Sequence, residues 1–301
     1  MTHISENWAN TVDPVIRHVF DTSLMGMTKD WVSRLYRVET SDRSIERSLG
    51  VGGFSDLQAH NGEAQELLSY EQYLQTYTHS EYSGLITIEK KWLEDDLTGT
   101  AKSRAEGAAG AWFRTRQKHA ASIFEEAFTT TRGADSLALC ASAHTSKTPG
   151  VAVQSNTGTA TLTSANIVAG QNNMNVYKDD QGELMSSNGT LVLAGNAQRE
   201  TLSKILKSVH VHGSANYDPS IGRETFDGDD LKGVIWNRIT GNKWFLIDEQ
   251  MMKTMLRWYD RVKKEIVRDV AFKQRAAQWM VYGRWSYGFD DWRWIYGNNP
   301  G

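Results

Sequence analysis

The stretch from Trp92 to Phe128 constrains the fold of this chain most, because one helical repeat runs through nearly all of it. Small or apolar residues recur at positions 93, 97, 101, 105, 108, 112, 120, 123, 124 and 127, the spacing of a single helix face. Glu94, Asp95 and Asp96 lie in the first turn, where the helix dipole favours negative charge. About 35 residues would form a rod of roughly 50 Å. We therefore predict a long helix on which other elements pack.

Three glycines weaken this predicted helix. Gly99, Gly107 and Gly110 each cost up to about 1 kcal/mol relative to alanine in a helix interior. They are explained if another backbone passes close to the helix, or if the rod bends where they stand. The sequence leaves both explanations open.

Composition limits the classes of protein to consider. The 301 residues suit one large domain or two smaller ones, and a hydrophobic content of 40% supports a packed core. The net charge is -3, with no long run of either sign, so the basic patch of a dedicated nucleic-acid-binding protein is absent. No apolar stretch approaches the roughly 18 residues of a membrane-spanning helix. The N-terminal M-T-H-I-S-E-N-W lacks the regions of a signal peptide.

Cysteine is nearly absent from the chain. Cys140 is the single cysteine, which excludes an intrachain disulfide and a zinc site made of cysteines. We therefore expect the chain to fold in a reducing cytoplasm.

The remaining segments predict an α+β protein. Residues 1–49 contain too few apolar positions for a core of their own and should pack on another element, with W-V-S-R-L-Y-R-V at 31–38 as a short strand. Residues 50–91 begin with turn-forming G-V-G-G and end in the strand-like G-L-I-T-I-E. Residues 149–283 alternate helices with apolar runs such as T-L-V-L-A and K-W-F-L-I-D, which indicates a second α+β unit.

Candidate metal ligands are few and isolated. His210 and His212 have a spacing found in metal sites, but no third ligand stands near them in the sequence. Acidic side chains follow in F-D-G-D-D, at positions 227, 229 and 230, without the spacing of a calcium loop. K-D-D-Q-G-E at 178–183 predicts a turn around Gly182. We interpret all three as polar loops and predict no metal or cofactor site.

Catalytic motifs are also missing. The sequence contains no G-x-S-x-G, P-loop or H-E-x-x-H. Cys140 and His144 could form a thiol–imidazole pair, but their neighbours carry no activating charge, so a buried unreactive cysteine is favoured. The paired carboxylates at 125–126 and 290–291 are expected on a helix end and in a turn. We predict that the chain is not an enzyme.

Aromatic residues crowd the C-terminal region. Exposed, such a ladder could stack on sugars or bases. Buried, it would form the inside of a sheet or a subunit contact, where Trp and Tyr are enriched, and we favour this second interpretation. The residues are Trp279, Tyr282, Trp285, Tyr287, Phe289, Trp292, Trp294 and Tyr296.

The order of these segments resembles the major capsid proteins of tailed bacteriophages, of the Hong Kong 97 type, and is most similar to the Mu-like major head subunit. The resemblance covers residues 70–297. It depends on motifs in a fixed order: Y-S-G-L-I-T-I-E-K-K-W-L-E-D-D, A-E-G-A-A-G-A-W-F-R-T-R, L-C-A-S-A-H-T, L-T-S-A-N-I-V-A-G-Q-N-N-M, K-D-D-Q-G-E-L, T-L-V-L-A-G-N-A-Q-R-E, K-W-F-L-I-D and Y-G-F-D-D-W-R-W.

This resemblance implies a division of the chain. Residues 1–48 would be an N-terminal arm, and 49–91 an extended β-hairpin loop that reaches over a neighbouring subunit. Residues 92–148 would form a peripheral domain with the long helix as its spine, completed by closing strands at 284–301. Residues 149–283 would form an α/β axial domain.

The resemblance also implies partners. The chain would assemble with itself as hexamers and pentamers into an icosahedral shell in the virion, made in the bacterial cytoplasm. Portal, scaffolding and maturation proteins and weak, non-specific contact with packaged double-stranded DNA are expected, but no membrane. No lysine lies between positions 50 and 82, so we predict no covalent cross-links between subunits. An encapsulin-like nanocompartment shell and a phage tail or baseplate component that binds glycans are the alternatives.

Overall fold

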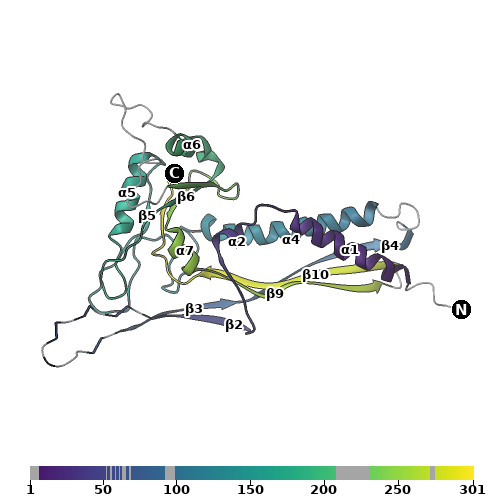
Figure 1. Ribbon diagram of the computed structural model, residues 1–301, viewed down its shortest axis with the longest axis horizontal. Helices are drawn as coiled ribbons and strands as arrows, with labels where there is room; N and C mark the ends of the chain where they lie inside the picture. Colours follow the sequence, from purple (N-terminus) through teal and green to yellow (C-terminus); the bar gives the residue numbers. More distant parts are fainter. Residues whose placement is uncertain are drawn as a thin grey trace.

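The long helix forms as predicted. The computed structural model describes residues 7–51, 53–54, 56–57, 59–60, 62, 66–67, 69–91, 99–207, 231–271 and 275–301. Within these ranges α4 (Gly99–Glu125) is one uninterrupted helix of 27 residues, and the acidic first turn expected at 94–96 lies outside them. Figure 1 shows α4 along an elongated arm of the molecule, next to a second unit that contains the C-terminus.

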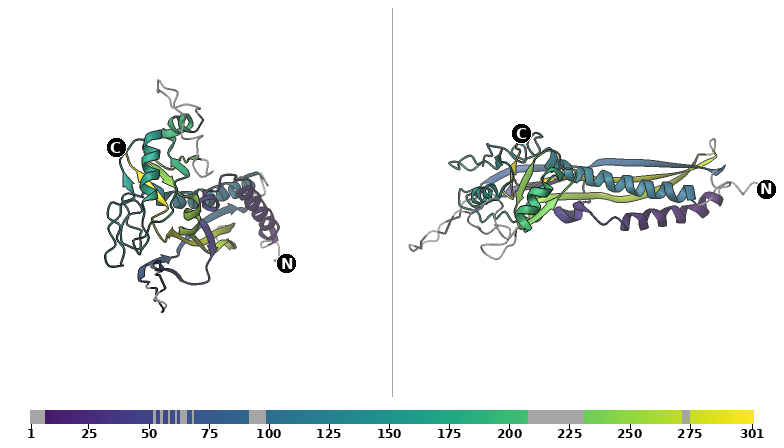
Figure 2. Two further views of the ribbon diagram at one scale, coloured as in Figure 1. Left: turned by 60° about the vertical axis from the view of Figure 1, so that its left-hand side comes forward. Right: turned by 90° about the horizontal axis from the view of Figure 1, so that it is seen from above.

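The small residues of α4 let another helix approach closely. Ala101, Ala105 and Ala109 are buried and follow one another at intervals of four residues, which places them on one face. Helix α1 (Asn7–Met25) runs beside α4 (Figure 2), and its Ile16 and Phe20 are buried with these alanines.

Gly107 differs from the alanines. A Cβ atom built on Gly107 would meet nothing within 4 Å, so no neighbouring backbone requires this glycine. Of the two explanations for this residue, close approach of another backbone is therefore wrong within this subunit.

A four-stranded sheet lies beneath these two helices, and its strand order is β1-β9-β10-β4. Its longest strands pair antiparallel with each other. Residues 256–271 and 276–283, which the sequence grouped with the second unit, therefore lie in the sheet beside α4 instead. The reason is period-two alternation along Leu256, Trp258 and Asp260, whose side chains are buried. The strands are β1 (Arg37–Thr40), β4 (Ser80–Glu89), β9 (Leu256–Ala271) and β10 (Ala276–Phe289).

The second unit contains a five-stranded sheet in the order β5-β11-β8-β6-β7, flanked by α5 (Ser164–Asn175) and α6 (Arg199–Lys207). Its central strands are buried along their whole length, which explains their continuous apolar sequences. Thr163 caps α5 through its side chain, as its position before the helix predicts. The strands are β5 (Thr157–Gly158), β6 (Leu191–Ala194), β7 (Lys232–Ile235), β8 (Trp244–Ile247) and β11 (Ile295–Asn298).

One predicted strand is a helix. Residues 31–38 begin with α2 (Trp31–Leu35), and only their end belongs to β1. The Asp30 side chain accepts a hydrogen bond from Val32 N, and the Gln117 side chain accepts one from Trp31 N. These bonds satisfy amides of the first turn, so a tertiary contact from α4 selects the helix over the strand.

Candidate assembly surfaces

A two-stranded hairpin extends away from both units. Its strands are β2 (Ile45–Val51) and β3 (Glu71–Thr78), which pair antiparallel. Ile45, Leu49 and Leu74 are 39%, 45% and 47% exposed, and Leu49 stands directly opposite Leu74. Alternation places these residues with Arg47, Thr76 and Thr78 on one face, which we call the outer hairpin face. An apolar face without a covering layer is typical of an interaction surface.

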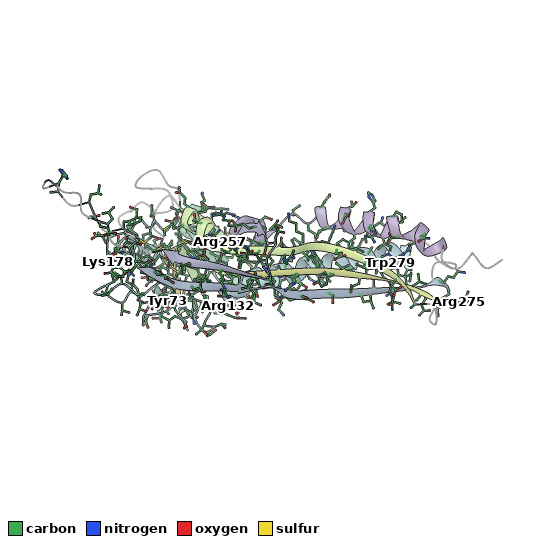
Figure 3. All side chains as sticks on the ribbon, turned by 90° about the horizontal axis from the view of Figure 1, so that it is seen from below. Tyr73, Arg132, Lys178, Arg257, Arg275 and Trp279 are labelled. Atoms are coloured by element: carbon green, nitrogen blue, oxygen red, sulfur yellow. The ribbon has the colours of Figure 1, made fainter. Side chains whose placement is uncertain are left out.

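The other side of the hairpin is fastened to the subunit. The amide of Gln72, only 4% exposed, donates from Nε2 to Thr148 Oγ1 at 3.0 Å and accepts at Oε1 from Lys147 N at 3.1 Å. Lys147 Nζ donates to the Gln72 carbonyl at 3.0 Å, and the Tyr73 hydroxyl is 2.9 Å from Thr145 Oγ1. The direction of the hairpin is therefore set by a buried polar contact, with Tyr73 at the hairpin end of the molecule in Figure 3.

The edge of the four-stranded sheet forms a second surface. β4 pairs with β10 on one side, and no other described strand pairs with its free edge. Between this edge and α4 lies a groove of about 460 Å³, which we call the β4 groove. It is lined by Glu81, Tyr82, Ser83, Gly84, Leu85, Ile86, Ala108, Ala111, Trp112, Thr115, Val281 and Trp285.

A buried ion pair holds α4 on the sheet. Arg116 donates from Nη1 and Nη2 to the two carboxylate oxygens of Asp260, at 2.7 and 3.1 Å. The guanidinium carbon lies 4.8 Å from the centre of the Trp258 ring and 5.4 Å from that of Trp285. The Arg116 side chain is thus held by an ion pair, by two hydrogen bonds and by contacts with two aromatic faces.

The carboxylates at 290–291 are structural. Asp290 accepts hydrogen bonds from Tyr77 Oη at 2.6 Å and Arg257 Nε at 2.7 Å, which ties the hairpin to the sheet. Burial and the adjacent Asp290 raise the pKa of Tyr77 well above its usual value. Asp291 accepts a hydrogen bond from Arg293 at 2.6 Å, so both carboxylates of the expected turn form ion pairs.

Other predicted candidates also have structural partners. His144 Nδ1 is 2.6 Å from Asp135, and its Nε2 is 3.1 Å from Asn156 Oδ1, so both ring nitrogens are engaged away from Cys140. Cys140 is buried, as predicted, and burial raises the pKa of its thiol. Glu125 accepts from Thr240 N at 2.9 Å and lies 3.0 Å from Lys243 Nζ.

The loops predicted as polar divide into two groups. The turn at 178–183 forms, with Gly182 at φ +92° as its sequence predicts. The histidines at 210 and 212 and the acidic cluster at 227–230 lie outside the described residues. Among the residues that are described, no group of three or more His, Cys, Asp or Glu side chains could hold a metal ion. None of the helices in the described ranges combines the length and apolar character that crossing a membrane requires.

The aromatic ladder is largely buried, as we favoured. Trp279, Trp285 and Trp294 are each 1% exposed or less, and Trp285 stacks on Tyr82 with ring centres 4.2 Å apart. Figure 3 shows Trp279 near Arg275 at the far end of the arm. These three tryptophans pack in the hydrophobic core, so they are not available to stack on sugars.

Comparisons with known proteins give a family match and similar folds. A family model described as "Phage capsid protein" matches residues 76–298. The fold is similar to that in the procapsid of bacteriophage JBD30, with a TM-score of 0.54, 11% identity, and 99% of this chain and 77% of that chain covered. A search of curated proteins finds no match.

Two further solved structures have similar folds. Mycobacterium phage Patience gives a TM-score of 0.57 at 11% identity, with 97% and 87% of the two chains covered. A virus-like particle from Pyrococcus furiosus gives 0.54 at 10% identity, with 95% and 98% covered. At these identities the solved structures show the fold alone, and it is the α+β phage capsid fold that the sequence predicts.

Proposed function

Because the chain belongs to the phage capsid protein family, we propose that it is the major capsid protein, assembling with itself as hexamers and pentamers into an icosahedral shell around a double-stranded DNA genome. The family match over residues 76–298 carries this proposal. The outer hairpin face and the free edge of β4 support it. Within the described part of one copy, no layer covers the first and no strand pairs with the second, so both are open to contact with another copy.

A finer assignment is part of the proposal. The ordered motifs support the Mu-like branch of the Hong Kong 97 type. The proposed divisions are an arm at 1–48, an extended loop at 49–91, a peripheral domain at 92–148 and 284–301, and an axial domain at 149–283. The pairing of β9 with β10 and of β10 with β4 supports moving residues 256–271 and 276–283 from the axial to the peripheral domain.

The proposed setting follows from this role. The protein would be made and assembled in the bacterial cytoplasm, with portal, scaffolding and maturation proteins, and would end in the virion. It would act as a structural protein without enzymatic activity. Contact with packaged DNA would be weak and independent of base sequence, as expected for a chain of net charge -3.

The experiment is electron microscopy of the purified protein together with analysis of particle contents. Closed shells, or rings and sheets of capsomers, are expected, and particles isolated from the host should contain double-stranded DNA. Protein-filled particles without a genome would favour the nanocompartment instead. No ordered assembly under any condition would refute the capsid role. The absence of covalent oligomers on denaturing gels would agree with the missing loop lysines.

A further inference from the structure

Both strands of the hairpin leave the four-stranded sheet at one point, and a histidine is buried there. His79, only 5% exposed, is the single residue between β3 and β4, and Ser41 begins the link from β1 to β2. Ser41 is fixed to the sheet, because its amide donates to the carbonyl of Asp260 at 3.1 Å. We call His79, Ser41 and Ser286 of β10 the hairpin joint.

The two ring nitrogens of His79 hold the joint together. Nε2 is 3.1 Å from Ser41 Oγ, and Nδ1 is 3.0 Å from Ser286 Oγ. The hydroxyl of Ser41 donates its proton to Glu46 Oε1 at 2.7 Å, so it accepts from His79, and the proton of the neutral ring lies on Nε2. Nδ1 therefore accepts the hydroxyl proton of Ser286.

A second proton on the ring would break this arrangement. It would lie on Nδ1, where Ser286 Oγ would have to accept instead of donating. Ser286 is buried, and its hydroxyl forms no other hydrogen bond with a described residue, so the hydroxyl proton would lose its partner. A buried donor without a partner destabilises the state that contains it.

The charges around the joint also oppose a cationic ring. Arg284 on β10 and Arg261 on β9 disfavour the charged form of His79, whereas Glu46 on β2 and a hydrogen bond to the backbone of Arg43 favour it. Burial contributes most, and together with the two guanidinium groups it lowers the pKa of His79 below its usual 6.5.

The Arg284 side chain has little compensation for its own charge. Its Nε atom is buried and has no hydrogen-bond partner among the described residues, and it lies 3.9 Å from Glu81 Oε1. The joint therefore has little capacity for one more positive charge.

We propose that the hairpin joint is an acid-sensitive fastening: protonation of His79 breaks its contacts with Ser41 and Ser286 and loosens the hairpin where it leaves the sheet. The bonds of Gln72 on the inner side of the hairpin involve no histidine and no carboxylate, so the hairpin stays attached there while the joint opens. The joint lies within one subunit and does not depend on the proposed assembly.

The opening of the joint has a defined pH dependence. A histidine that opening exposes to water titrates near 6.5, whereas the buried ring resists protonation. The closed joint binds fewer protons, so it is most favoured above pH 6.5 and loses stability as the pH falls below this value. Between pH 7.5 and 5.5 the opening equilibrium should rise by up to about tenfold, the factor for a group that titrates near 6.5 in the open state alone.

Hydrogen exchange of the unassembled full-length chain, followed by mass spectrometry, tests the joint. Peptides that cover residues 38–46 and 76–83 report on its amides, after correction for the intrinsic effect of pH on exchange. In the wild type their protection factors should fall by up to about tenfold between pH 7.5 and 5.5. A peptide from α5 in the second unit should change by less than about twofold.

Variants separate the histidine from general effects of acid. His79→Gln keeps a donor and an acceptor but does not titrate, so its joint peptides should change by less than about twofold over the same range. Arg284→Gln removes a neighbouring cation, so the response should shrink to about threefold or less. His18→Gln, which removes an exposed histidine of α1, is the matched control and should respond like the wild type.

The outcomes decide the proposal without reference to the shell. A wild-type response below about twofold would overturn it, and so would an equal response in the wild type and His79→Gln. If His79→Gln does not fold, a wild-type response in Arg284→Gln overturns it instead. The presence or absence of particles in the electron microscope bears on the capsid function alone, so the two proposals fail independently.

Discussion

Replacing Asp260 with alanine should destabilise the subunit by about 3 kcal/mol, because it leaves a buried guanidinium without its counter-charge. The Asp260 and Arg116 side chains are 5% and 16% exposed, and two hydrogen bonds join them. The substitution also removes the acceptor of the bond from Trp258 Nε1, 2.9 Å long.

The magnitude follows from what remains after the substitution. Removing one partner of a buried pair typically costs about 3–5 kcal/mol. The lower end applies here, because Arg116 keeps its contacts with the faces of Trp258 and Trp285 and its exposed part can recruit water. A loss of about 3 kcal/mol lowers the folding equilibrium constant by roughly 150-fold.

The assay is urea denaturation of the unassembled subunit, followed by tryptophan fluorescence. The double variant Arg116→Met with Asp260→Leu should be more stable than the single variant by about 1 kcal/mol or more, since it removes both charges, although Trp258 Nε1 still lacks its acceptor. Glu200→Ala, which breaks the exposed pair with Lys204, should leave the midpoint unchanged. A single variant within about 1 kcal/mol of the wild type, or a double variant as unstable as the single, would refute the reasoning.

Three further predictions use matched or internal controls. Gly283→Ala should destabilise the subunit because its Cβ would overlap the Trp112 ring, whereas Gly107→Ala, in open space on the same arm, should stabilise it by up to about 1 kcal/mol; urea midpoints compare them. Burial and nearby cations lower the pKa of His119 below its usual 6.5, so the folded state binds fewer protons than the unfolded chain. The free energy of unfolding should therefore fall as the pH drops below 6.5. A His119→Gln variant should show a shallower decline in urea midpoints between pH 7.5 and 5. Cys140 should resist iodoacetamide until the protein is denatured, and rapid labelling in the folded state, read by mass spectrometry, would contradict its burial.

The features that the sequence predicted well are those set by local repeats. The helical period between 101 and 124 depends on one face of alanines and larger apolar residues, which is visible without knowing what packs there. The apolar runs at 191–194 and 244–247 are buried on both sides, so their composition alone identifies them as strands.

The features that the sequence did not predict depend on contacts between distant parts of the chain. Trp31 begins a helix because Gln117, 86 residues away, binds its amide, and no local pattern contains that contact. The domain boundary that the resemblance implies at 283 cuts through β10, although the alternation of β9 and β10 is present in the sequence. Ile45, Arg47 and Leu49 also alternate, but an alternating strand predicts a buried face, and here that face is exposed.

The exposure of that face connects the fold to the proposed assembly. The hairpin is fixed on its inner side by the bonds of Gln72, and the sheet is fixed to α4 by Arg116, so the subunit presents two rigid surfaces. A rigid surface loses less conformational entropy on binding than a loose one. Polar contacts that appear redundant in one copy, such as those of Lys147 with Gln72, thus reduce the cost of joining the next copy. Loosening this inner contact by Gln72→Ala should therefore weaken assembly more than it weakens folding.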